Sequence, residues 1–253
     1  MKSMQFDRLK MEVHENRRQM GSAAAKHGVS IMKQIIADKG VVNVVFAAAP
    51  SQIELYEEIL ASDIDFSKVR CFHMDEYIGL AKESRQRFGN YLDAHLFSKA
   101  RWKEIHLIRG YSEDPQQECF RYALLLEQFP PDVIFHGIGE NGHLAFNDPP
   151  VADFHDTKLV KIVHMDEVCR MQQVHDGCFA SIDLVPKRAI SLTIPILTAG
   201  TSFLVVTVPG PTKADAIYRT VTDEIDERCP ATILRRHDKA TLFVDNEAAS
   251  RVL

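Results

Sequence analysis

Short runs of Val, Ile and Phe, bounded by turn residues, alternate along the chain with longer segments of helical pattern. The segment 41–48 is almost wholly apolar, which is typical of a strand covered on both faces. Strands that alternate with helices predict a mostly parallel sheet with helices on both of its faces. The expected strands are 41–48, 69–73, 105–108, 132–137, 190–194, 203–208 and 241–245. The expected helices are a long one over 6–38 that breaks near Gly28, one from Gln52, two over 88–97 and 113–128, and one from Thr212.

The paired prolines at 130–131 and 149–150 punctuate loops, because no Gly/Ser-rich run separates two parts of the chain. No internal repeat is present in the sequence. The fold class that we predict is therefore a doubly wound, Rossmann-like α/β domain over residues 1–253. Ligands of such sheets bind beyond the carboxyl ends of the strands, so the loops that follow the strands are expected to form the site.

The composition is that of an ordinary globular protein, with 253 residues, 45% of them hydrophobic and 26% charged. The formal net charge of -5 gives no basic surface of the kind that binds nucleic acid, and we expect no nucleic-acid partner. The segment 189–212 carries no charge, but Pro195, Gly200 and Pro209 interrupt it. It predicts two buried strands and a turn, not a membrane span.

Five cysteines are scattered through the chain without a C-x-x-C pair, which indicates free thiols in a reducing compartment. The first 18 residues contain no apolar stretch of the kind found in signal peptides. We therefore expect a cytoplasmic protein.

The loop 137–150 contains three glycines in six residues, which lets the backbone approach a ligand and expose N–H groups to an anion. Its G-x-G-x-x-G spacing also fits a dinucleotide fingerprint. That interpretation is disfavoured because the paired prolines at its end prevent a following helix, and we predict no cofactor. His143 follows the glycines, and Asp148 lies five residues later. A histidine beside a carboxylate is a usable general base, whereas the simpler alternative is a surface histidine that is hydrogen-bonded locally.

A second loop, 72–80, carries Asp75 and Glu76 at the carboxyl end of the strand 69–73. One side chain of such a pair can point into a cleft while its neighbour points away. Adjacent acids at this place indicate a solvated turn, a metal site or a catalytic carboxylate. His73 and His136 also lie near strand ends, but side-chain alternation argues against their convergence with Asp75 and His143. We predict no metal and expect His136 to be a hydrogen-bonded core residue.

The third loop, 49–51, precedes a helix N-terminus, where free N–H groups and the helix dipole favour an anion. It contains no glycine and one hydroxyl, that of Ser51. The anion site indicated here is therefore weakly marked.

Together, the segments 74–80 (MDEYIGL) and 137–149 (GIGENGHLAFNDP) resemble the glucosamine-6-phosphate deaminase/isomerase family. The resemblance extends over 41–249. The related 6-phosphogluconolactonases share the scaffold but typically carry Arg after the Asp-Glu pair, where this chain has Tyr77.

The resemblance implies a mechanism. His143, beside Asn141 and Asp148, would assist opening of a pyranose ring. Asp75 would take the C2 proton and deliver it toward C1, with the C2 amine leaving as ammonia. The resemblance also implies self-association and a sugar-phosphate or related monosaccharide substrate. The residues implied to bind it are Ala49, Ser51, Glu76, Gly139, Gly142 and Lys213.

This chain departs from the family in ways that matter for the site. Asp148 stands where most members have Glu, so its reach to His143 is shorter, and Asn141 replaces the Asp of many members. The phosphate loop, usually Thr-Gly-Ser-Thr-Pro, is here Ala-Ala-Pro-Ser-Gln at 48–52, and an expected arginine falls on or near Gly177. Each charge-assisted hydrogen bond that is absent costs about 1.5–3 kcal/mol of binding free energy.

We therefore expect the far end of the sugar to be bound differently, with Lys213 as the remaining obvious cation. The residues that could compensate by loop position are Arg85, Arg87, Arg170 and His175. Two alternatives to a deaminase stay open, namely a sugar lactone hydrolase in which His143 activates water, and a sugar-binding sensor without catalysis.

Overall fold

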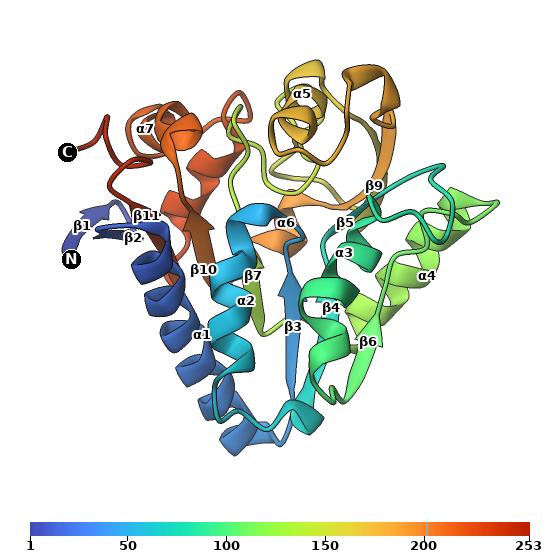
Figure 1. Ribbon diagram of the computed structural model, residues 1–253, viewed down its shortest axis with the longest axis horizontal. Coiled ribbons are helices and arrows are strands. Elements are labelled where there is room, and N and C mark those ends of the chain that lie inside the picture. The colour runs from blue at the N-terminus through green and yellow to red at the C-terminus, as the bar shows by residue number, and fades with distance from the viewer. Residues whose placement is uncertain (201) are drawn as a thin grey trace.

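An eight-stranded sheet forms the centre of the computed structural model, which describes residues 1–200 and 202–253 (Figure 1). Two antiparallel strands lie at one edge, and all other neighbours in the sheet are parallel. The strand order is β1 (Lys2–Phe6), β2 (Leu9–His14), β11 (Ala240–Asp245), β10 (Phe203–Val208), β7 (Val133–His136), β3 (Val42–Phe46), β4 (Val69–His73) and β6 (Glu104–His106).

Helices cover both faces of this sheet. Val42, Val44 and Phe46 of β3 pack with α1, α2 and α3, whereas Val45 belongs to the apolar cluster that includes residues of α4, α6 and α7. This alternation is why 41–48 is apolar throughout. The predicted α/β class with a mostly parallel sheet is confirmed. The bounds are α1 (Arg17–Lys39), α2 (Ile53–Leu60), α3 (Phe88–His95), α4 (Pro115–Gln128), α6 (Ile194–Leu197) and α7 (Ala214–Thr222).

A small antiparallel sheet lies at the carboxyl ends of the central strands. Its order is β5 (Asp75–Tyr77), β9 (Arg188–Leu192) and β8 (Val160–His164), and β5 follows β4 after one residue. Helix α5 (Glu167–His175) lies between β8 and β9 in the chain, and it is above the central sheet in the view of Figure 1. The sequence had indicated neither β8 nor α5. Asp166 caps α5 by accepting the Val168 N–H, a signal that was available in the sequence.

The predicted helix over 6–38 is wrong in its first part. Residues 9–13 alternate between buried and less buried side chains, which is the period of a strand, and they form β2. The helix begins at Arg17, after Asn16 has capped it by accepting the Gln19 N–H. The expected break at Gly28 is also wrong, since α1 continues through it. A Cβ at Gly28 would lie 2.5 Å from the Phe135 ring, so glycine allows the helix to approach the sheet.

The uncharged segment 189–212 forms most of β9, then α6 and β10, as buried elements of the α/β core. Among the described residues, no helix has the length and apolar character needed to cross a bilayer. The cysteines are free thiols, as predicted.

Candidate functional site

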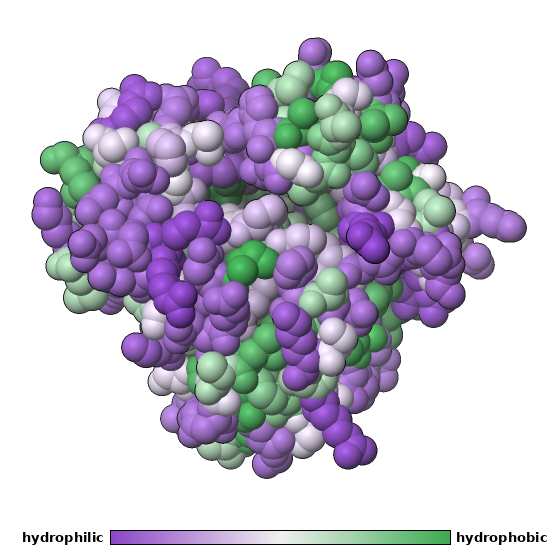
Figure 2. All heavy atoms as spheres, in the orientation of Figure 1, coloured by the Kyte–Doolittle hydropathy of each residue, from purple (hydrophilic) through white to green (hydrophobic). Residues whose placement is uncertain are grey.

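A cavity of about 230 Å³ opens at the carboxyl ends of β3, β4, β7 and β10. Figure 2 shows this face of the molecule hollowed between the part that carries α7 and the part that carries α5. The cavity has a reacting end, defined here by Asp75 and His143, and a far end, defined by loop 49–51 and Lys213. The other residues that line it are Arg17, Ala47, Ala48, Met74, Phe88, Gly137, Ile138, Gly139, Ala145, Phe146, Gln172, Gln173, Asp176, Pro209, Gly210 and Thr212.

Asp75 and its neighbour Glu76 point in opposite directions, as the alternation along a strand predicts. Asp75 lines the cavity, whereas Glu76 is completely buried and does not. Burial and the neighbouring Glu76 charge both raise the pKa of Asp75 well above its usual value. Its carboxylate is therefore an unusually strong base for an aspartate.

Glu76, predicted to bind substrate, is instead a structural acid. It pairs with Arg87 at 3.2 Å and accepts the N–H groups of Phe88 and Gly89 at the start of α3. Burial raises the pKa of Glu76, although Arg87 and these N–H donors oppose the shift. The pair ties β5 to α3 and so fixes the strand that presents Asp75.

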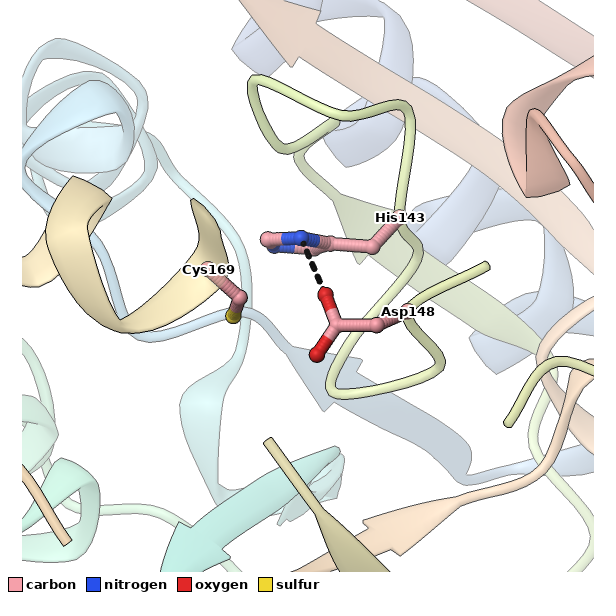
Figure 3. Close-up of side chains that lie close together, drawn as sticks. All are labelled: His143, Asp148 and Cys169. Atoms are coloured by element: carbon pink, nitrogen blue, oxygen red, sulfur yellow. Dashed lines mark ion pairs between the residues drawn. The ribbon is translucent and has the colours of Figure 1, made fainter. Parts of the chain in front are cut away.

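The imidazole of His143 lines the cavity, and it points toward the buried Asp148 carboxylate (Figure 3). Its Nδ1 is 3.0 Å from Asp148 Oδ1 and 2.8 Å from Asn141 Oδ1. Both neighbours are oxygen acceptors, so Nδ1 carries the ring proton when the imidazole is neutral. Nε2 is then left with a lone pair and without a protein partner among the described residues.

Asp148 reaches His143 although it is one methylene shorter than the family's usual Glu. Its Oδ1 also accepts from Asn141 Nδ2 at 3.0 Å, and Oδ2 accepts the Asp166 N–H at 3.0 Å. Burial opposes ionisation of Asp148, but the hydrogen bonds from His143, Asp166 and Asn141 outweigh it and lower the pKa. The carboxylate is therefore held ionised behind the imidazole.

Gly139 makes room for the imidazole, because a Cβ there would lie 2.1 Å from the His143 ring. Gly142 has φ +84° and turns the chain back beneath it. The N–H groups of both glycines are bonded within the loop, to His143 O and Gly139 O. The expectation that these glycines offer N–H groups to a ligand is therefore wrong, and of the two only Gly139 lines the cavity. Ala145, at φ +50°, also lines it, a strained backbone of a kind found at functional sites.

Helix α5 supplies cavity residues that the sequence analysis missed. Gln172 bonds to the Glu140 N–H at 2.9 Å and to Asp176 at 3.3 Å. Gln173 accepts a 2.7 Å hydrogen bond from the buried Tyr77 hydroxyl through its Oε1. Its Nε2 has no partner among the described residues, although the side chain is 94% buried and lines the cavity. Gln173 therefore presents an oriented N–H donor to whatever the cavity holds.

Ala49, Ser51 and Lys213, which the family resemblance implies as substrate-binding residues, line the far end of the cavity. The Lys213 side chain is 93% buried, and its ammonium forms no hydrogen bond or ion pair with the described residues. Burial lowers the pKa of Lys213, while the charges of Asp176 and Glu140 act in the opposite direction. A buried cation without a counter-ion, facing a cavity, is a binding group for an anion.

The four residues proposed to compensate at the far end do not line the cavity. Arg87 is paired with Glu76, Arg170 donates to the backbone carbonyls of Ile182 and Val185, and His175 lies 3.4 Å from Glu140. Arg85 is on the exposed surface. Loop position alone was a poor guide, because Arg87, Arg170 and His175 contact groups outside the cavity. Besides Lys213, the cavity is lined by Arg17, which comes from the start of α1.

The described residues contain one cluster with metal-ligand chemistry, His143, Asp148 and Cys169, whose ligand atoms all lie within 4.8 Å (Figure 3). Burial raises the pKa of the Cys169 thiol well above its usual value, which disfavours the thiolate that a metal needs. The histidines considered at strand ends are turned into the core. His73 accepts the Ile108 N–H, and His136 Nε2 lies 3.0 Å from Leu197 O. Burial lowers their pKa values to about 3 and about 4.

A model of the family described as glucosamine-6-phosphate isomerases/6-phosphogluconolactonase matches residues 15–243. The chain belongs to this family. A protein named glucosamine-6-phosphate deaminase from Lactobacillus delbrueckii subsp. bulgaricus is 36% identical over 84% of this chain and 88% of its own. A protein of the same name from Listeria monocytogenes serotype 4a is 34% identical over 90% of this chain and 95% of its own.

Solved structures of family members share the fold. A monomeric glucosamine-6-phosphate deaminase superposes with a TM-score of 0.85 at 24% identity, over 95% of this chain and 99% of the other. A 6-phosphogluconolactonase from Thermotoga maritima gives a TM-score of 0.74 at 19% identity, over 93% and 98%. Members with either activity thus share this scaffold, so the reaction must be argued from the site.

Proposed function

We propose that this family member is a glucosamine-6-phosphate-type deaminase/isomerase. It opens the pyranose ring, isomerises the aldose to a ketose and releases the C2 amine as ammonia. The observation that supports this most is the presence of a buried carboxylate, Asp75, and an oriented imidazole, His143, in one cavity. The curated relatives of this chain that carry the deaminase name cover it almost fully.

His143 opens the ring. Its Nδ1–H points to Asp148 and Asn141, so Nε2 takes the proton from the anomeric hydroxyl and returns one to the ring oxygen. The ionised Asp148 stabilises the imidazolium that forms between these two transfers.

Asp75 moves the proton between carbons. Its carboxylate removes the C2 proton from the open-chain aldehyde, and the electron pair of the C–H bond forms the C1–C2 double bond. The π pair of the C1 carbonyl moves to O1, and O1 takes a proton from the C2 ammonium, which gives an enolamine. The same group returns the proton to C1, which leaves an iminium at C2. Water adds to C2 and ammonia departs, giving the ketose. A raised pKa favours the first transfer, because it brings the carboxylate closer to the acidity of the C–H group.

The other polar groups of the cavity hold the sugar. Gln173 Nε2 donates to a sugar oxygen between the two ends, and the Tyr77 hydroxyl keeps the amide in the orientation that allows it. Lys213 and the Ser51 hydroxyl bind the phosphate at the far end. Self-association stays a prediction from the family, one member of which is described as monomeric.

The experiment that tests the reaction measures ammonia released from glucosamine 6-phosphate and, separately, acid released from 6-phosphogluconolactone. We expect ammonia release from the amino sugar and no lactone hydrolysis above background. Lactone hydrolysis without ammonia release would replace the deaminase with the lactonase, and binding without either product would indicate a sensor.

A further inference from the structure

Arg17 lies at the first turn of α1 and lines the same cavity as Ser51 and Lys213. Two groups hold its side chain. Nε and Nη2 donate to the two carboxylate oxygens of Glu54 on α2, and Nη2 also donates to the Pro50 carbonyl at 2.9 Å. The guanidinium is thus fastened to the loop that precedes α2, which is the loop at the far end of the cavity.

A count of donors shows what remains of the guanidinium. An arginine has five N–H groups, and the contacts with Glu54 and Pro50 use the one on Nε and the two on Nη2. The two on Nη1 have no acceptor among the residues that the structure describes. About half of the side chain is exposed and Arg17 lines the cavity, so an amino group without an acceptor is available to a ligand there.

Acidic groups near the far end partly offset the charges of its two cations, Lys213 and Arg17. The negative charges of Asp176, which lines the cavity, and of Glu140 partly offset the positive charge of Lys213. Arg17 is balanced by Glu54, whose hydrogen bond raises the pKa of the guanidinium, and Asp245 and Tyr91 act on it in the same direction. A phosphate dianion carries two negative charges, and Lys213 alone offers one positive charge. The Arg17 guanidinium, which Glu54 already holds in place, offers a second charge and free N–H donors, so little side-chain entropy is lost when it binds.

We propose that Arg17 is the second cation that binds the anionic far end of the substrate, a phosphate monoester. It reaches the site from α1, and so performs the task of the arginine that the family resemblance would place near Gly177. Glu54 is a positioning residue for it. This inference rests on the proposed function only in that the substrate is a sugar phosphate.

The test is the affinity of the full chain for two inert ligands, glucitol 6-phosphate and unphosphorylated glucitol, together with inorganic phosphate, measured by calorimetry. Arg17→Ala is expected to weaken binding of both phosphate ligands about 10- to 100-fold, the effect of a charge-assisted hydrogen bond. Arg17→Lys should give a smaller loss, because one ammonium cannot serve Glu54 and the phosphate together. Arg18→Ala removes the same charge from the exposed neighbour and should change nothing.

The ratio of the glucitol 6-phosphate and glucitol affinities within each variant is independent of the fraction of folded protein. An unchanged ratio in Arg17→Ala would overturn the inference, and so would a wild-type protein that does not bind inorganic phosphate. If Arg17→Ala fails to fold, the ratio in Arg17→Lys decides in the same way. Arg17-dependent phosphate binding without ammonia release would remove the proposed reaction and leave this anion site. Ammonia release with the same KM in wild type and Arg17→Ala would support the proposed reaction and remove Arg17 from the anion site.

Discussion

The two ends of the cavity are built differently. At the reacting end, Asn141, His143 and Asp148 come from one loop and form hydrogen bonds with one another within eight residues of sequence. The nearby carboxylate, Asp75, begins β5 one residue after β4. At the far end, the groups come from the start of α1, the loop before α2, α5 and the residues before α7. A compact local network resists change, whereas a site assembled from separate elements can exchange one cation for another. On the proposed function, this difference would let the chain keep the reacting groups that the family resemblance implies while it binds the anion through other residues.

The largest effect is expected at the reacting end, for Asp75→Asn. The amide cannot accept the C2 proton, so kcat should fall about 10²–10⁴-fold, the range for loss of a general base. The affinity for glucitol 6-phosphate should stay within about twofold, because an amide of the same size fills the cavity equally well. A steady-state assay of ammonia release and a calorimetric titration measure the two quantities. A variant that keeps its kcat would remove Asp75 from the reaction.

The next effect tests the network behind the imidazole. In Asp148→Asn the amide can donate to Nδ1, which favours the wrong tautomer and places a proton on Nε2. We expect kcat to fall about 10²-fold or more, and Asp148→Glu to restore most of it, since the family's usual residue keeps the acceptor. The measurement is ammonia release across pH. Equal rates in Asp148→Asn and wild type would show that Asp148 only fills space.

A smaller effect is expected at the far end. Lys213→Ala should raise KM about 10- to 100-fold with little change in kcat, since a charge distant from the reacting carbons contributes mainly to binding. Lys187→Ala, at an exposed position, is the control. If Lys213→Ala lowers kcat as strongly as Asp75→Asn, the division of the cavity into two ends is wrong.

A smaller change in KM is expected at Gln173, which is proposed to bind the sugar between the two ends of the cavity. Gln173→Ala is expected to raise KM about 3- to 10-fold, the effect of one neutral hydrogen bond. Tyr77→Phe should cause part of this loss, and the double variant should be no worse than Gln173→Ala, because the hydroxyl acts through the amide. Additive losses in this cycle would mean that Tyr77 acts independently.

The smallest expected effect concerns stability. Because the pKa of Asp75 is raised on folding, its contribution to stability is fully present below the unfolded value, near 3.8, and is lost as the pH rises through the folded value. Asp75→Asn should therefore unfold at a higher temperature than wild type at pH 7.5, by about 2–4 °C for each kcal/mol relieved. The difference should shrink toward pH 4. A variant less stable than wild type at pH 7.5 would contradict the inferred cost of burying this charge.

The same contrast explains how much the sequence could predict. The apolar run at 41–48 and the motifs at 74–80 and 137–149 predicted the sheet, the helices on both faces and the groups of the reacting end, because each depends on residues close together in sequence. Arg17 and Gln173 were missed because nothing near either residue marks it as facing a cavity. Their placement depends on contacts with Glu54 and Tyr77, which are 37 and 96 residues away.

Glu76 was misassigned for a related reason. Adjacent acids after a strand look equivalent in sequence, and only the partner Arg87 shows which of them is structural. The first strands were missed because the polar residues of 9–14 fit the solvent face of a helix as well as an edge strand until the cap at Asn16 is considered.

The central claim is that Asp75 and His143 act on one monosaccharide in one cavity. The most direct measurement is the transfer of deuterium to C1 of the ketose product from glucosamine 6-phosphate that is deuterated at C2, followed by NMR in H₂O. The wild-type protein should place deuterium at C1, Asp75→Asn should place none, and His143→Gln should slow its appearance. Deuterium transfer at the wild-type rate in Asp75→Asn would contradict the account.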